Sequence, residues 1–164
     1  MMLQTLTDSV ILGLGASLIL DGWALGRRSI AGVPMLDYGW LTRWLAGLPA
    51  GRLRLEPGQT APLTASERAA GWALHYAIGV LYAGVFLLIV GPGWMDQPSV
   101  LPALVFGIVT ILAPFLILQP ALGRGVFASR TPAPWTARLQ TLLNHGVFGL
   151  GLYATALTLM IVRS

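Results

Sequence analysis

The residues of this chain best suited to chemistry are two histidines and an aspartate inside long apolar segments. His75 lies seven residues after Arg68, and His145 lies seven residues after Arg138. In a helix that rises ~1.5 Å per residue, each imidazole is about 10 Å from its arginine, and Asp21 is about 9 Å from the first arginine after its own segment. If these arginines mark one membrane surface, all three side chains lie at a similar depth inside the membrane.

Two amide side chains extend this set into a polar layer. Gln119 belongs to the third apolar segment, and Asn144 precedes His145 in the fourth. An ionised carboxylate inside a membrane costs about 2.5 to 3.5 kcal/mol on insertion scales and rarely faces lipid, so we expect Asp21 to face other helices and to have a partner there. The predicted ligand-binding site is therefore Asp21, His75, Gln119, Asn144 and His145.

Four kinds of chemistry fit this layer. The side chains can hydrogen-bond between helices and do nothing more, each bond contributing about 0.6 to 2 kcal/mol. They can bind a proton, a small ligand or a lipid headgroup, because histidine titrates near neutral pH and intramembrane Asp and His residues occur in proton relays. A divalent metal on Asp21, His75 and His145, or haem between the two histidines, would also suit these residue types. The sequence leaves the cofactor unknown.

Enzymatic chemistry has less support. The chain has no P-loop, no H-E-x-x-H and no G-x-S-x-G motif, and without cysteine it has neither a thiol nucleophile nor a disulfide. His and Asp side chains alone can do acid and base work on a lipid, which keeps a lipid enzyme as a third alternative. We therefore assign no catalytic residues.

The composition predicts a membrane protein. Of the 164 residues, 55% are hydrophobic and 10% charged, and the mean hydropathy is +0.74. Four apolar segments, at about 9–26, 71–90, 101–122 and 139–162, are each close to the ~20 residues that a helix needs to cross the hydrocarbon layer. We predict an all-α membrane protein, a four-transmembrane-helix bundle, with residues 1–164 forming a single integral membrane domain.

The basic residues, all arginine, predict the orientation of the chain. Six lie between the first and second spans, three between the third and fourth, and none between the second and third. Because cytoplasmic loops carry an excess of basic residues, both termini are expected outside the cytoplasm. A net charge of +4 spread over short loops also argues against nucleic acid as a partner.

The two halves of the chain resemble each other. The run from Ala24 to Arg27 at the end of the first span recurs as Ala121 to Arg124 at the end of the third. The second and fourth spans share an arginine, a histidine and a glycine at matching spacing, the glycines being Gly79 and Gly149. This pattern favours a parallel repeat of two helical hairpins, and chance similarity in a chain rich in Ala, Leu and Gly is the alternative.

Small residues and prolines indicate how the spans pack. Gly13, Ser17 and Asp21 are spaced so that one closely packed face of the first span carries the carboxylate inward. Pro114 and Pro120 are expected to interrupt the helical hydrogen bonds of the third span near Gln119. A kink is thus predicted there.

The loop after the first span contains an amphipathic segment. Its aromatic residues and central arginine are Tyr38, Trp40, Arg43 and Trp44. Their helical spacing predicts a short helix in the headgroup layer, ended by Pro49 and Gly51, that anchors the chain at the interface or contacts a partner protein.

The end of this loop carries further local signals. Glu56, Pro57, Gly58 and Gln59 together predict a turn. Thr64 or Ser66, with Glu67, can cap the start of the second span.

Several short runs resemble a family of small bacterial four-helix inner-membrane proteins known as a domain of unknown function. They include His75-Tyr76-Ala77-Ile78-Gly79, Gln119-Pro120-Ala121-Leu122-Gly123 and His145-Gly146-Val147-Phe148-Gly149, and the similarity extends over nearly the whole chain. The resemblance implies a multi-pass protein of the bacterial inner membrane and supplies no activity, substrate or catalytic residue.

The sequence thus predicts a non-catalytic inner-membrane protein with an intramembrane polar site and periplasmic termini. The alternative is an accessory subunit of a larger membrane complex, in which the aromatic loop residues contact a membrane protein partner or a second copy of the chain. A metal- or haem-binding membrane protein is the second alternative. The lipid bilayer is a partner in each case.

Overall fold

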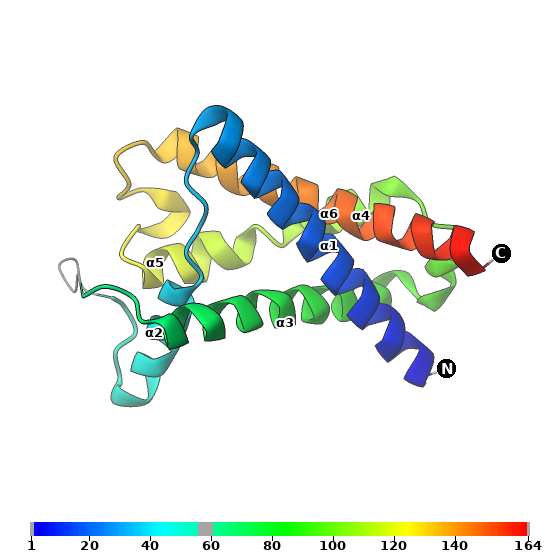
Figure 1. The fold of residues 1–164 in the computed structure, drawn as a ribbon, viewed down its shortest axis with the longest axis horizontal. Helices are drawn as coiled ribbons and strands as arrows, with labels where there is room; N and C mark the ends of the chain where they lie inside the picture. The colour runs from blue at the N-terminus through cyan, green and yellow to red at the C-terminus, as the bar shows by residue number, and fades with distance from the viewer. Residues whose placement is uncertain (1, 56–60, 164) are drawn as a thin grey trace. The chain divides into compact units, whose positions relative to one another are not determined.

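The computed structural model describes residues 2–55 and 61–163, and within these ranges the protein is helical without any β-strand (Figure 1). Four stretches are long and apolar enough to cross a membrane, namely Leu3–Ala31, Ala65–Val90, Val100–Ala121 and Pro134–Arg163. Most large apolar side chains on them are exposed, as expected for helices that face lipid. The predicted all-α fold with four spans is confirmed.

The helices of the first, second and fourth spans extend beyond the apolar ranges predicted from the sequence, whereas the third span matches its predicted range to within one residue. The α-helices are α1 (Met2–Ala31), α2 (Gly39–Gly47), α3 (Ala65–Val90), α4 (Val100–Val109), α5 (Gln119–Ala121) and α6 (Pro134–Arg163). Short 3₁₀ turns cover Leu48–Ala50, Pro92–Met95 and Val126–Ala128. The extensions are polar because arginine and glutamine continue a helix at little cost, whereas hydropathy detects only its apolar part.

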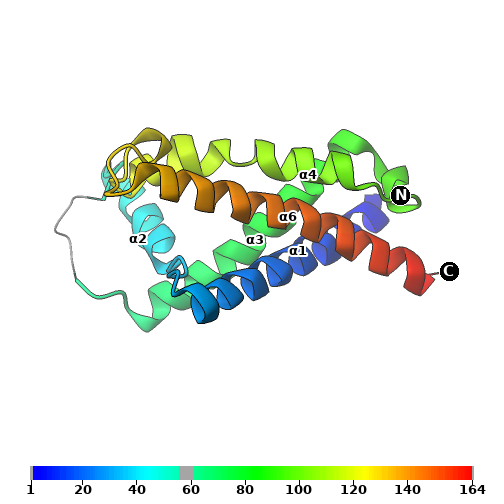
Figure 2. The same ribbon diagram turned by 90° about the horizontal axis from the view of Figure 1, so that it is seen from above.

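The third span is not one regular α-helix. After α4 the N–H of Ala113 donates to the carbonyl of Thr110 at 3.2 Å, and residues Pro114–Leu118 form a π-helical turn that leads into α5 (Figure 2). Pro114 has no N–H to offer to Thr110, which explains the irregular hydrogen bonding. The interruption predicted near Gln119 thus begins at Thr110, well before that residue in the chain.

Contacts divide the chain into two compact units. The first unit comprises the chain up to Met35, Tyr76–Val109, and the chain from Asn144 onward. The second unit comprises Leu36–His75 and Thr110–Leu143. Helices α3 and α6 contribute to both units.

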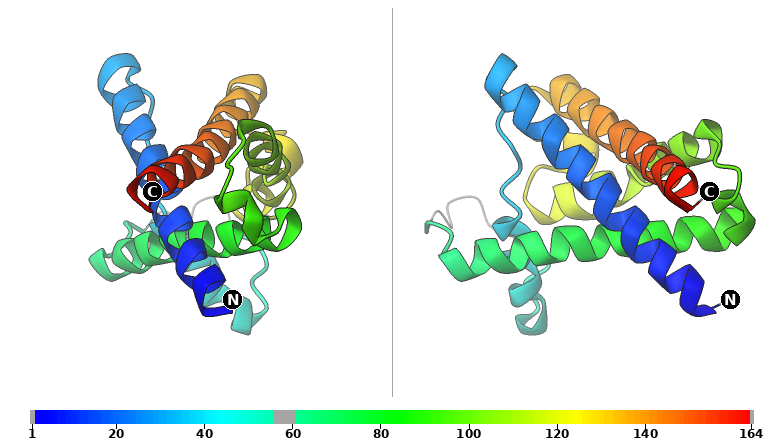
Figure 3. Two further views of the ribbon diagram at one scale, coloured as in Figure 1. Left: turned by 90° about the vertical axis from the view of Figure 1, so that its right-hand side faces the viewer. Right: turned by 45° about the vertical axis from the view of Figure 1, so that its right-hand side comes forward.

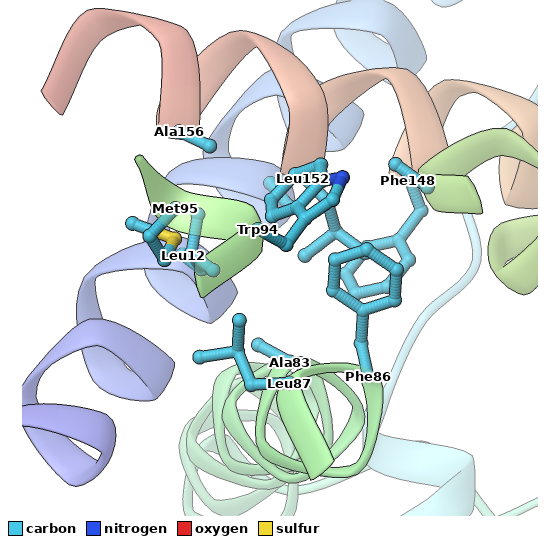
Figure 4. Close-up of a cluster of buried hydrophobic side chains, with 11 residues drawn as sticks. Leu12, Ala83, Phe86, Leu87, Trp94, Met95, Phe148, Leu152 and Ala156 are labelled. Carbon is cyan, nitrogen blue, oxygen red and sulfur yellow. The ribbon is translucent and has the colours of Figure 1, made fainter. Parts of the chain in front are cut away.

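The first unit has an apolar core to which helices α1, α3, α4 and α6 contribute (Figure 4). Phe86 lies at its centre, fully buried, with the ring of Trp94 at 4.7 Å and the ring of Phe106 at 5.2 Å between centroids. Trp94 and Met95 come from the turn after α3, so the connection between the second and third spans folds back into the core. This packing fixes the helices that carry Asp21 and His145.

Glycines allow the helices of the first unit to approach closely (Figure 3). A Cβ atom on Gly13 of α1 would collide with the backbone of Val80 on α3, and one on Gly149 of α6 would lie 2.6 Å from the carbonyl oxygen of Ala103 on α4. Helix α1 also packs against α6, since Gly151 approaches the backbone of Ala16. The predicted small-residue face of α1 is therefore a real packing surface.

The second unit contains the predicted amphipathic helix. Helix α2 ends in the turn Leu48–Ala50, and Gly51 follows in the left-handed conformation with φ of 71°. Pro49 and Gly51 thus end the helix as predicted, while its place in the headgroup layer stays a prediction. The predicted turn at Glu56, Pro57, Gly58 and Gln59 lies outside the described residues.

A capping box starts α3. The Thr64 hydroxyl accepts the N–H of Glu67 at 3.1 Å, and the Glu67 carboxylate accepts the N–H of Thr64 at 2.7 Å. Thr64, rather than Ser66, is the capping residue. Glu67 also binds Arg43 of α2 through two hydrogen bonds of 2.7 Å, and this contact raises the pKa of Arg43 above its ordinary value. One carboxylate therefore caps α3 and attaches α2 to it.

Candidate functional site

Asp21 is one of two buried aspartates among the described residues of the first unit; the other, Asp8, pairs with Arg163. Only 7% of Asp21 is exposed, and its Oδ2 accepts a hydrogen bond of 2.8 Å from the hydroxyl of Tyr76 on α3. This hydrogen bond joins the first span to the second. It lies near the point where α1 and α3 cross, which is at Gly13 and Gly79. As expected, Asp21 faces other helices and not lipid.

Ser17 places a second polar group one helical turn from Asp21. The residue is 1% exposed, and its hydroxyl has no hydrogen-bond partner among the described residues. It faces Gly79 of α3, where any Cβ atom would collide with the Ser17 hydroxyl. The glycine therefore leaves space for a hydroxyl beside the carboxylate.

Asn144 and Arg27 form a second polar contact in the first unit. The Arg27 guanidinium donates to Asn144 Oδ1 at 2.9 Å and lies 5.5 Å from the ring of Trp23. The hydrogen bond ties the end of α1 to α6. Asn144 thus has a structural partner that its position in the sequence did not reveal.

His145, the neighbour of Asn144, interacts with a different helix. Its imidazole forms a hydrogen bond with the backbone of Gly107 on α4. At Gly107 the helices α4 and α6 also approach closely, because a Cβ atom there would lie 2.5 Å from the carbonyl oxygen of His145 and 2.7 Å from the Cα atom of Gly149. The neighbours Asn144 and His145 therefore bind to α1 and α4 respectively.

The second unit holds His75 and Gln119. The imidazole of His75 stacks on the ring of Tyr38 with centroids 4.1 Å apart, and Trp72 packs edge-on against both rings. Gln119 is 7% exposed and donates to the Thr141 hydroxyl at 3.2 Å. Both predicted residues have local partners in this unit.

The aromatic loop residues make contacts inside the second unit. Trp44 Nε1 donates to the Leu53 carbonyl at 3.0 Å, and the Arg43 guanidinium lies 5.1 Å from the ring of Trp40. Tyr38 stacks on the imidazole of His75. None of these residues is fully exposed, so their geometry gives no support to a partner-binding role.

The predicted site residues share one property. Each has a hydrogen-bond or ring partner of its own in the same unit, with Asp21, Asn144 and His145 in the first unit and His75 and Gln119 in the second. No group of three His, Cys, Asp or Glu side chains within residues 2–55 and 61–163 is arranged to hold a metal ion. The metal alternative therefore gains no support from the geometry.

Tyr76 is the site residue that sequence reasoning missed. No motif or spacing in the sequence distinguishes this tyrosine, which follows His75 directly. The register of the antiparallel crossing would have revealed it, since Gly13 meets Val80, Ser17 meets Gly79, and one more turn brings Asp21 to Tyr76. The register in which α1 and α3 pack, and not the residue types alone, thus identifies Tyr76 as the partner of Asp21.

These features define the class of protein: a multi-pass, all-helical membrane protein whose spans pack through glycines and interhelical polar contacts. The family described as "Protein of unknown function (DUF2938)" matches residues 10–159, so the chain belongs to that family. This confirms the resemblance found in the sequence. Neither a curated protein nor a solved structure matches the chain.

Proposed function

We propose that this protein is a non-catalytic inner-membrane protein that takes up a proton, or binds a small ligand, at a polar site centred on Asp21. The observation that carries the proposal is a carboxylate, 7% exposed, in a membrane-spanning helix and hydrogen-bonded to a tyrosine of the next span. Intramembrane carboxylates are costly, and they mark ion, proton or ligand sites when they face the interior.

Ser17 and Tyr76 make the Asp21 site more than a bare acid. Tyr76 can donate to the ionised carboxylate or accept from the protonated one, so the pair stays hydrogen-bonded in either state. The buried Ser17 hydroxyl adds a group that donates one hydrogen bond and accepts others. This set suits a proton or a small polar ligand. Asn144 and His145, which belong to the same unit as Asp21, stay candidate members of the site, and the binding roles predicted for His75 and Gln119 of the second unit stay predictions.

We further propose that the protein lies in the bacterial inner membrane with both termini periplasmic. The unequal distribution of arginines between loops supports this orientation. In that orientation Asp21 is in the cytoplasmic half of its span, about 9 Å from Arg27 along the helix.

Infrared difference spectroscopy of the purified protein during a pH titration tests the proposal. Asp21 should give a carboxylic acid band that appears as the pH falls and is absent from Asp21→Asn. Tyr76→Phe should move the frequency of this band, because the phenol hydroxyl no longer binds the carboxyl group. Asp96→Asn is the matched control, since Asp96 is exposed in the loop after α3 and should leave the band unchanged.

A native mass spectrum of the gently extracted protein complements the titration. Added mass that disappears in Asp21→Asn would show a small ligand at this site. If Asp21→Asn alters neither the infrared band nor any bound mass, the site has no binding role and its polar contacts serve only to hold helices together. A partner protein lost from a Trp40→Ala, Trp44→Ala variant would instead support the accessory subunit.

A further inference from the structure

A hollow of about 330 Å³ lies in the second unit, and none of the predicted site residues lines it. Its lining consists of Arg54, Pro120, Gly125, Val126, Ser129 and Arg130. This volume is near the lower limit of small-molecule sites, about 300 Å³. Two arginines and a serine therefore line an open hollow large enough for a small polar group.

Two separate segments of the chain build the hollow and are joined by a backbone hydrogen bond. The N–H of Leu55 donates to the carbonyl of Ala121 at 2.8 Å, which holds Arg54 beside the turn after α5. Within that turn the N–H of Arg130 donates to the carbonyl of Arg124 at 2.8 Å. The backbone thus positions both arginines of the lining.

One lining residue, Gly125, occupies a position that only glycine can take. Its φ of +74° is in the left-handed region, and a Cβ atom there would lie 2.5 Å from the Ser129 hydroxyl and 2.9 Å from the Arg130 side chain. Only glycine combines this conformation with such close packing. The turn therefore packs Ser129 and Arg130 directly against Gly125.

The charges of the lining are not balanced within it. Three other arginines of the unit have side-chain partners: Arg43 pairs with Glu67, Arg68 with Asp37, and Arg138 donates to the Phe127 carbonyl. Arg54 and Arg130 form no ion pair with any acidic residue in the described part of the chain, and the buried Nε of Arg54 has no hydrogen-bond partner there. None of the six lining residues is acidic.

We infer that this hollow binds a phosphate-bearing anion. Arginine presents a planar fork of N–H donors that matches the oxygens of a phosphate, and two such groups can hold one phosphate from different sides. Ser129 adds a hydroxyl donor, and Pro120 and Val126 add apolar surface for the organic part of the ligand. The phosphate can belong to a free molecule or to a lipid headgroup, since basic pockets on membrane proteins bind both kinds of anion. The inference rests on residues other than those of the Asp21 site.

Thermal unfolding of the solubilised full chain tests this inference. The Tm is measured with inorganic phosphate against sodium chloride of equal ionic strength, and with phosphatidylglycerol against phosphatidylcholine in mixed micelles. Binding to the folded state raises the Tm. We expect phosphate, phosphatidylglycerol or both to raise it above the matched reference.

Substitutions locate the effect. Arg54→Gln and Arg130→Gln should each weaken binding by about tenfold or more, because each removes charge-assisted hydrogen bonds. Arg130→Lys keeps the charge but loses the fork, and should give an intermediate loss. Arg52→Gln is the matched control: it removes the same charge from the same loop, but Arg52 does not line the hollow. Circular dichroism of each variant shows whether it is folded.

The source of the phosphate follows from which probe acts. A response to inorganic phosphate identifies a free phosphate compound, and a response to phosphatidylglycerol alone identifies a lipid headgroup. The inference is overturned if neither probe differs from its reference, or if Arg52→Gln weakens binding as much as the two lining variants do.

Discussion

The two helical hairpins of the first unit, α1 with α3 and α4 with α6, both pack closely through a glycine but carry different polar groups. In both, the glycine four residues after the histidine lies at the crossing: Gly79 meets α1 and Gly149 meets α4. This shared crossing supports the internal repeat inferred from the sequence. A common packing device is present in both halves of the chain.

The two hairpins differ in the polar side chains at matching positions. If the two Ala-Leu-Gly-Arg runs are aligned, Leu118 stands where the first hairpin has Asp21. If the two histidines are aligned, Gly146 stands where the first hairpin has Tyr76. The second hairpin therefore lacks both members of the buried pair, and its histidine binds a backbone group instead. The comparison indicates that the glycine crossing is structural and that the Asp21 pair is the specialised feature.

The largest loss of stability is expected from replacing the glycines at the helix crossings with alanine. Gly13→Ala and Gly149→Ala each place a methyl group against the backbone of the neighbouring helix, so each should lower the free energy of unfolding by about 1 to 3 kcal/mol. Unfolding of the purified protein in mixed micelles by a denaturing detergent measures this loss.

Two glycines in the same hairpins serve as controls. At Gly22 no atom lies within 4 Å of the position that an alanine methyl group would take, and the nearest contact at Gly146 is a flexible leucine side chain at 4.0 Å. Gly22→Ala and Gly146→Ala should be neutral or slightly stabilising, because alanine favours a helix over glycine. Equal losses at all four positions would show that the crossings are not special.

A smaller effect, confined to the first hairpin, is expected from Tyr76→Phe. The variant removes the donor to Asp21 and should cost about 1 to 2 kcal/mol of unfolding free energy in the same assay. Tyr82→Phe, on the same helix but without a hydrogen bond to its hydroxyl in the described residues, should change stability by less than about 0.5 kcal/mol. Equal unfolding free energies for Tyr76→Phe and Tyr82→Phe would show that the hydrogen bond between Tyr76 and Asp21 does not stabilise the hairpin.

The link between the hairpins should matter less. Arg27 of the first hairpin donates to Asn144 of the second, and both residues are only partly buried. Asn144→Ala should therefore cost about 0.6 to 1 kcal/mol. The loss should vanish when Arg27→Gln is already present, and a double-mutant cycle measures this coupling. Additive losses would mean that the two side chains do not interact.

The smallest change in stability is expected from Pro114→Ala. Alanine restores an N–H that can reach the Thr110 carbonyl, so the third span should become a continuous helix like α1. Hydrogen exchange over residues 110–118 should slow, while the free energy of unfolding changes by no more than about 1 kcal/mol. Unchanged exchange would mean that packing, and not the proline, causes the irregularity.

Much of the fold was predictable because the membrane imposes simple rules. The apolar segments predicted the four spans, Pro49 and Gly51 predicted the end of α2, and the spacing of Gly13, Ser17 and Asp21 predicted the packing face of α1. Each of these rests on local chain properties. The interruption of the third span was predicted near Gln119 but begins at Thr110, because Pro114 alters the hydrogen bonds of the helical turn before it.

The site was less predictable than the fold. Residue types and depth selected Asp21, but Tyr76 and Arg27 emerged as partners only from the register in which neighbouring helices cross. The hollow between Arg54 and Arg130 gave no sequence signal, because its lining comes from loops more than sixty residues apart.

The sequence by itself determined the number of spans, the helical class and the family, because backbone groups in lipid must be satisfied within each helix and the apolar lengths follow. Only the tertiary structure decided which polar side chains meet, which glycines carry the crossings and which arginines stay without an acidic partner among the described residues. Those outcomes depend on helix register and loop contacts, which are set by packing between distant parts of the chain and not by the local order of residues.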